Sequence, residues 1–131
     1  MTTIEVSSSK RVELVDVTDR VQRAISESGL DSGLAVLFVP HTTAAITINE
    51  NADPDVVRDL VKELNTVIPF DDGYRHTEGN SAAHIKSTLV GASETILVED
   101  GRTVLGTWQG IYFCEFDGPR RRKLHIQVIG S

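Results

Sequence analysis

Two histidines, a glutamate and an asparagine lie close together in the segment His76-Thr77-Glu78-Gly79-Asn80-Ser81-Ala82-Ala83-His84. A folded protein gains little from burying such groups, because their polar atoms lose water and need new partners. Imidazoles, in contrast, transfer protons near neutral pH, and in neutral form they bind metals. The segment therefore predicts a chemical site. The alternative is a loop histidine and a helix-start histidine with satisfied hydrogen bonds.

A third histidine, His41, directly follows the most apolar strand-like run of the chain, residues 34–39. Active-site residues often lie just beyond strand ends. The hydroxyl of Thr43 adds a polar group beside the ring, and Asn49 and Glu50 end the next strand pattern. We expect His41 to meet the other two histidines in space, although a ring that points into water is the alternative.

Three neutral imidazoles with one open position suit zinc, and they suit magnesium less well. The predicted metal ligands are His41, His76 and His84, with Glu50 or Glu78 as a base or as a group that orients a ligand. His41 and His84 are also candidate proton-transfer residues. This pattern is less specific than paired cysteines at a standard zinc spacing. Asn80 fits a substrate-binding role and a helix N-cap equally well.

The only tryptophan lies between two glycines in Gly106-Thr107-Trp108-Gln109-Gly110. Trp108 either covers the edge of the core or, together with the amide of Gln109, stacks on a flat heteroaromatic ligand. A basic run, Arg120-Arg121-Arg122-Lys123, follows soon after. Most of this run is explained by a solvated hairpin tip, but the fixed fork of a guanidinium also matches phosphate or carboxylate. We select Arg120 as the substrate-binding candidate.

The composition limits the class of protein. A length of 131 residues predicts one domain, residues 1–131, and the hydrophobic and charged fractions of 40% and 24% are those of a globular protein. The net charge of -6 argues against a nucleic-acid binder. No apolar run has the length of a membrane span, and no signal peptide is recognisable. A single cysteine, Cys114, is in keeping with a cytoplasmic location.

The periodicities predict an α+β fold with a mostly antiparallel β-sheet or β-sandwich and about three helices. Alternation over residues 4–6 and 12–14 indicates two strands joined as a hairpin, and residues 34–39 read as a strand covered on both faces. Further strands are expected over residues 45–49, 95–99, 110–116 and 124–129. The predicted helices begin at Thr18 as N-cap, at Asp53-Pro54, and at Asn80 or Ser81; the third is expected to turn Ile85 and Leu89 inward.

These motifs together resemble the YjbQ-like family of small conserved proteins, whose members are often labelled secondary thiamine-phosphate synthase. The resemblance covers nearly the whole chain and depends on His41-Thr42-Thr43, Asn49-Glu50, the His76 to His84 segment, Ser87 and Gly106-Thr107-Trp108-Gln109. It implies about seven strands in two sheets, a homotrimer, and pockets near the subunit boundaries.

For function, the resemblance implies a small cytoplasmic transferase with thiamine-phosphate synthase activity. That reaction joins a pyrimidine methyl diphosphate to a thiazole phosphate, so it needs cations for the leaving group and a stacking surface. Two alternatives remain open. One is a metal-dependent hydrolase of a small substrate, and the other is a trimeric metal-binding or ligand-binding protein without turnover.

Overall fold

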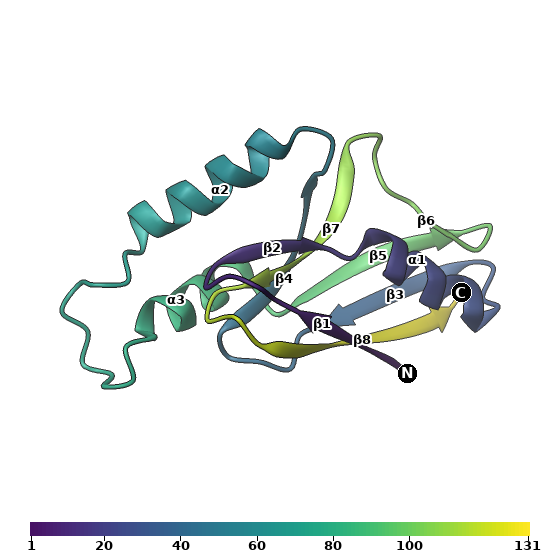
Figure 1. Cartoon of the computed structure of the whole chain (residues 1–131). Coiled ribbons are helices and arrows are strands. Elements are labelled where there is room, and N and C mark those ends of the chain that lie inside the picture. Colours follow the sequence, from purple (N-terminus) through teal and green to yellow (C-terminus); the bar gives the residue numbers. More distant parts are fainter.

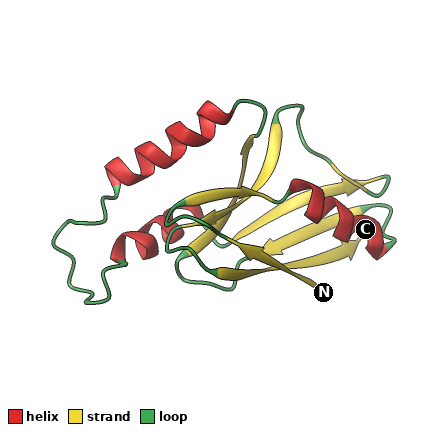
Figure 2. Ribbon diagram, in the orientation of Figure 1, coloured by secondary structure: helices red, strands yellow, loops and turns green.

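The computed structural model describes residues 1–131 as two antiparallel sheets and three helices (Figures 1 and 2). This confirms the predicted α+β class, with eight strands because the short β6 adds one. The elements in chain order are β1 (Thr2–Ser7), β2 (Glu13–Asp16), α1 (Thr18–Ser28), β3 (Gly33–Phe38), β4 (Ala44–Glu50), α2 (Pro54–Val67), α3 (Ser81–Val90), β5 (Ser93–Glu99), β6 (Arg102–Thr103), β7 (Gln109–Glu115) and β8 (Arg121–Gly130).

The larger sheet has the order β1-β8-β3-β5-β6, and the smaller one the order β2-β7-β4. The main core contains side chains from both sheets and from one face of α1, among them Ile25, Leu37, Ile46, Phe113 and Leu124. These side chains come from period-2 strand patterns and a period-3.6 helix pattern, which the sequence displays directly. The core thus holds the ends of β3, β4 and β7 in fixed relative positions.

The first two strands do not form the expected hairpin. Strand β1 pairs with β8 in the larger sheet, whereas β2 pairs with β7 in the smaller one. Alternation indicates that a strand is half-buried, but it does not identify the partner strand. The long-range pairings therefore overturn the local prediction.

Helices α1 and α2 begin and end close to the predicted residues. Pro54 is the first residue of α2, and the Asp53 carboxylate accepts a hydrogen bond from the Asp55 N–H at 2.9 Å. At α1 the N-cap position belongs to Val17, so Thr18 is the first helical residue and its hydroxyl donates to Asp16 at 2.6 Å. Although α2 has a clear apolar stripe, none of its residues is fully buried, and the helix lies at the edge of the molecule in Figure 1. It contacts β2 of the smaller sheet, and Leu64 packs against the second, smaller core cluster.

Helix α3 turns a different face inward from the one expected. Ile85 and Leu89 are exposed, and the buried residues are Ala82, Ala83, Lys86 and Ser87. Small side chains let the helix approach β4 closely, and the Ser87 hydroxyl donates to the Ala44 carbonyl at 2.6 Å. Close packing of small residues therefore decides the orientation of α3, not its two large apolar residues.

Strand β3 is covered on one face only. Ala35 and Leu37 are fully buried, whereas Leu34 and Phe38 are 36% and 47% exposed. The prediction that both faces are covered is therefore wrong for the single chain, because no helix packs on the outer face of the larger sheet (Figure 2). That face keeps an apolar surface open to solvent.

Candidate functional site

A polar cavity of about 350 Å³ opens where three connections meet. These are the β3–β4 connection, the start of α3 with the loop before it, and the β7–β8 turn. No large hydrophobic side chain lines it. The lining residues are Pro40, His41, Thr42, Thr43, Glu78, Asn80, His84, Asp117, Arg120 and Arg122. The cavity therefore gathers predicted site residues from distant parts of the chain.

His41 lies half-buried at the wall of this cavity. Its Nε2 atom accepts a hydrogen bond from the main-chain N–H of Lys123 at 2.9 Å. Because an amide can only donate, the proton of the neutral ring is on Nδ1. Burial, and then the charge of Arg122, lower the pKa of His41 below its usual value. His41 is thus a neutral hydrogen-bond donor at pH 7, and proton acceptance at Nε2 would break its bond to β8.

His84 and His76 lie together on the other side of the cavity. Their ring centroids are 5.5 Å apart with an interplanar angle of 84°, which is an edge-to-face pair. Nε2 of His76 lies 3.8 Å from Oε2 of Glu78. His84 lines the cavity, and His76, which does not line it, packs against the His84 ring. The bend at Gly79, where φ is +80°, lets the loop fold back over the helix start.

Asn80 occupies the N-cap position of α3, but its side chain makes no capping hydrogen bond. Its Nδ2 atom donates instead to Oδ2 of Asp117 at 2.9 Å, and its Oδ1 atom is buried without a partner. An unsatisfied buried amide oxygen costs free energy unless a ligand or water serves it. The side chain is therefore directed to the cavity and not to the helix.

Arg122 is the site residue that the sequence did not reveal. Its side chain is 5% exposed and forms an ion pair with Glu115, which is fully buried. Nε donates to Oε1 of Glu115 at 2.9 Å, and Nη2 donates to the Thr43 hydroxyl at 2.8 Å. Burial alone raises the pKa of Glu115, but hydrogen bonds from Arg122, the Asp117 amide and Ser8 outweigh it and lower that pKa. The signal available in the sequence was the alternation of β8, which turns Arg122 inward with Leu124 and Ile126.

Arg120 lies at the rim of the same cavity. Its Nε donates to the Asp117 carbonyl at 2.8 Å, and its Nη2 donates to the Asp117 carboxylate at 3.0 Å. In both Arg120 and Arg122 the hydrogen bonds use Nε and Nη2, and Nη1 makes none. Each guanidinium is therefore oriented by protein groups while one nitrogen stays available to a ligand.

A family model described as "UPF0047 protein YjbQ-like" matches residues 2–131. The chain belongs to this family. It is similar to the UPF0047 protein MJ1081 of Methanocaldococcus jannaschii, with 56% identity over 97% of this chain and 92% of the relative. It is also similar to YugU of Bacillus subtilis, with 53% identity over 98% of both chains.

Solved structures of the YjbQ-like family share this fold closely. A crystal structure from Clostridium acetobutylicum has a TM-score of 0.97 and 52% identity, and the match covers 98% of this chain and 100% of that one. A protein of unknown function from Sulfolobus solfataricus has a TM-score of 0.95 at 34% identity, with 99% and 96% covered.

Four other predicted site residues of this YjbQ-like chain lie outside the cavity. Asn49 and Glu50 end strand β4 and pair with Gly110 and Gln109, whereas the cavity lies at the beginning of β4. A strand of this length separates the two ends by about 20 Å. Trp108 is 63% exposed beside them. Within one chain the predicted residues thus form two groups: the cavity, and a second group of Asn49, Glu50, Trp108 and Gln109.

The predicted three-histidine metal site is brought together only in part. His76 and His84 are adjacent, but no group of three or more His, Cys, Asp or Glu side chains is arranged to hold a metal ion. His41 also has its Nε2 engaged by the Lys123 amide. Zinc binding by all three histidines needs their rings to move, and it stays a prediction.

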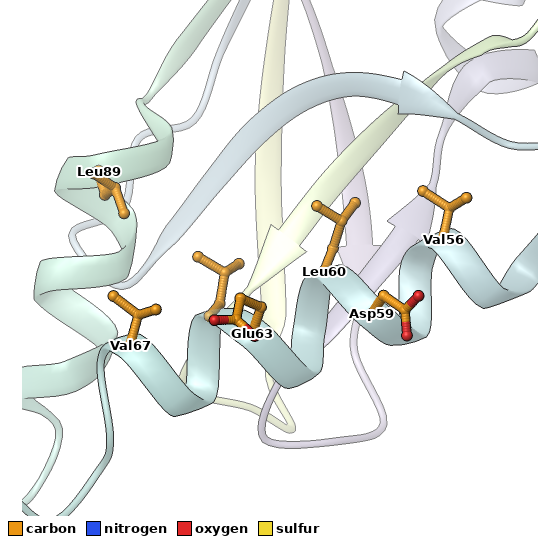
Figure 3. A pocket seen from close by; sticks show the side chains of 7 residues that line it. Val56, Asp59, Leu60, Glu63, Val67 and Leu89 are labelled. Carbon is orange, nitrogen blue, oxygen red and sulfur yellow. The ribbon is translucent and has the colours of Figure 1, made fainter.

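An apolar groove of about 410 Å³ lies elsewhere, between α2 and α3. Figure 3 shows Val56, Leu60 and Val67 along α2, with Leu89 of α3 at the end of the row. It shares no lining residue with the polar cavity, and its lining is hydrophobic apart from Asp59 and Glu63. No helix of the chain has the length and apolar character needed to cross a membrane.

Proposed function

We propose that the polar cavity is the active site of a small cytoplasmic enzyme that acts on a phosphate-bearing substrate. The observation that carries the proposal is the pair of arginines, Arg120 and Arg122, which line the same cavity. Each is oriented by a carboxylate, and in each the Nη1 atom makes no hydrogen bond within the protein. Oriented guanidinium groups match the oxygens of a phosphate. Enclosure in a pocket strengthens that attraction over what it would be in water.

The remaining polar groups give the cavity both hydrogen-bond donors and acceptors. His41 offers its Nδ1 proton, whereas Asp117 and Glu78 offer carboxylate oxygens. A purely cationic pocket would suit phosphate alone. Mixed charge suits a ligand that carries an anionic group at one end and an amine or N–H at the other. An aminopyrimidine diphosphate has this character.

Thiamine-phosphate synthesis is the specific reaction that we assign to the cavity. A bond forms between the thiazole nitrogen and the pyrimidine methylene carbon, the bond from that carbon to the diphosphate oxygen breaks, and pyrophosphate leaves with the electron pair. Arg120 and Arg122 would stabilise the leaving group. His84, paired with His76 and open to the cavity, would protonate it.

The experiment compares thiamine phosphate formation by the wild type, His84→Ala and His125→Ala. His125 is the matched control because it lies on the outer face of the larger sheet, where Nδ1 is 2.8 Å from the Thr3 hydroxyl. Loss of a general acid lowers rates by about 100-fold or more, so only His84→Ala should show that loss. Equal rates in all three proteins, or no product from the wild type, would refute the assignment.

A metal-activated water is the second candidate, because His76 and His84 are close enough to suggest a shared ion. On this hypothesis the protein is a zinc-dependent hydrolase, with Glu78 as base. The purified protein should then contain close to one zinc per chain, and His76→Ala and His84→Ala should each remove it. A metal-free protein that also fails to bind added zinc would eliminate both this candidate and a metal-binding protein without turnover.

A further inference from the structure

Residues 69–79 form the loop between α2 and α3 that carries His76 and Glu78. This loop is tied to the rest of the chain near both of its ends. Just before it, the Ile68 carbonyl accepts a hydrogen bond from Nζ of Lys86 at 2.8 Å. At its end, the Gly79 carbonyl accepts one from Nη2 of Arg11 at 3.3 Å.

The side chains of Arg11 and Lys86 also both form cation–π contacts with the ring of Phe70. The guanidinium carbon of Arg11 lies 3.6 Å from the ring centroid, and Nζ of Lys86 lies 3.9 Å from it. A cation over an aromatic face is attracted by the negative charge of that face. Phe70 is only the second residue of the loop, so both contacts act where the loop leaves α2. Arg11, Phe70 and Lys86 are called the loop clamp below.

Lys86 has an unusual environment for a lysine. It is fully buried, and it takes part in none of the ion pairs of the chain. Burying an ammonium group without a carboxylate is costly, and a methionine of similar length would fill the space at lower cost. The groups that replace water for this ammonium are the Ile68 carbonyl and the Phe70 ring, both at the start of the loop.

Lys86 and His84 are two residues apart on α3, so one short helix segment contacts both the loop and the cavity. The position of the loop against α3 therefore determines whether His76 reaches the ring of His84. We propose that the loop clamp positions His76 against His84, with Arg11, Phe70 and Lys86 as positioning residues. The importance of that pairing for catalysis rests on the proposed function, but the positioning itself does not.

The test uses Phe70→Leu and Lys86→Met, with Arg75→Gln as a control. Arg75 is an exposed cation of the same loop that makes no hydrogen bond or ion pair. The main-chain N–H groups of residues 69–79 donate no hydrogen bond, so the side-chain contacts of the clamp are what holds this loop. The amide order parameters of these residues, measured by NMR relaxation, should fall in the clamp variants and remain unchanged in the control, because each clamp variant removes a cation–aromatic contact.

Imidazole NMR signals give a second readout that a general loss of stability would not produce. Those of His76 and His84 should move toward the shifts of solvent-exposed rings in both clamp variants, while the His125 signal stays in place. Unchanged order parameters and unchanged His76 signals in Phe70→Leu would overturn the proposal. If Lys86→Met does not fold, Phe70→Leu and Arg11→Gln decide the outcome. Neither measurement uses a ligand, so the result is separate from that of the proposed function.

Discussion

The Arg122 guanidinium lies against the Glu115 carboxylate beneath the polar cavity, with 5% and 0% of the two side chains exposed. This ion pair joins the last residue of β7 to the second residue of β8, across the turn that carries Asp117 and Arg120. Ser8 and the Asp117 amide donate to the same carboxylate. A buried charge with several partners gives the floor of the cavity one fixed arrangement.

Replacement of Glu115 by glutamine should therefore be strongly destabilising. It leaves the Arg122 charge buried without a counter-ion, which typically costs about 3–5 kcal/mol. Urea denaturation at pH 7 measures the change in the free energy of unfolding. The control is Asp55→Asn in the exposed Asp55–Arg58 pair, where a change of no more than about 1 kcal/mol is expected. Similar small effects at both sites would contradict the role of the buried pair.

His41 should make folding stability depend on pH. Its pKa in the folded protein is lowered by burial and by Arg122, so below about pH 6.5 the unfolded chain takes up a proton before the folded one does. The contribution of His41 to the free energy of unfolding is fully present above the pKa that His41 has in the unfolded chain. It is lost as the pH falls through the lower pKa that His41 has in the folded protein.

The variant His41→Gln tests this dependence, because it removes the titration at this position. The stability difference between wild type and variant should be larger at pH 7.5 than at pH 5.5. The substitution His76→Gln serves as a control in the same urea titrations, because His76 is half-exposed and, unlike His125, does not contribute to the lowered pKa of His41. If the free energy of unfolding changed with pH in the same way in wild type and His41→Gln, folding would not lower the pKa of His41, and the prediction would be wrong.

Trp108 lies with the second group of predicted residues, away from the cavity in the single chain. The substitution Trp108→Ala should therefore leave the affinity for inorganic pyrophosphate unchanged, whereas Arg120→Gln should weaken it by about tenfold, the size of a charge-assisted hydrogen bond. Isothermal titration calorimetry measures both. A similar loss in Trp108→Ala would mean that Trp108 reaches a cavity from another copy of the chain.

The homotrimer remains a prediction, and two exposed apolar surfaces are suited to such contacts. One is the outer face of the larger sheet, with the exposed Leu34 and Phe38. The other is the α2–α3 groove, where Val67 and Leu89 at its end are both 64% exposed. Light scattering should give three times the chain mass of 14.3 kDa. Val67→Asp should lower this mass, and Thr66→Asp on the polar side of α2 should not. A monomeric wild type would contradict the prediction.

The sequence predicted local elements better than it predicted their partners. Asp53-Pro54 located the start of α2 because capping depends on neighbouring residues. The partner of β1 could not be predicted, because β8 lies at the other end of the chain. The prediction of which face of α3 is buried was wrong. That face is determined by the close packing of Ala82 and Ala83 against β4, and a hydrophobicity pattern does not show which small residues pack closely.

The same limit applies to the site. His41, Glu78, Asn80, His84 and Arg120 were identified from residue type and local spacing, and they lie in one cavity. The sequence did not single out Arg122, because it lies in a run of four basic residues, and such a run is most simply interpreted as a solvated turn. Its role depends on a buried carboxylate across the β7–β8 turn. Asn49 and Glu50 lie at the other end of β4 from the cavity within one chain, and their place in a site stays a prediction.

The most direct test is a titration of the protein with inorganic pyrophosphate, followed by NMR shifts of assigned amides and imidazoles. We predict that the largest shifts occur at residues 41–43, 78–84 and 117–122, and that Arg120→Gln reduces them. Shifts centred on residues 49–51 and 106–110, or none at millimolar pyrophosphate, would contradict the claim that the cavity of His41, His84 and Arg122 binds the phosphate group.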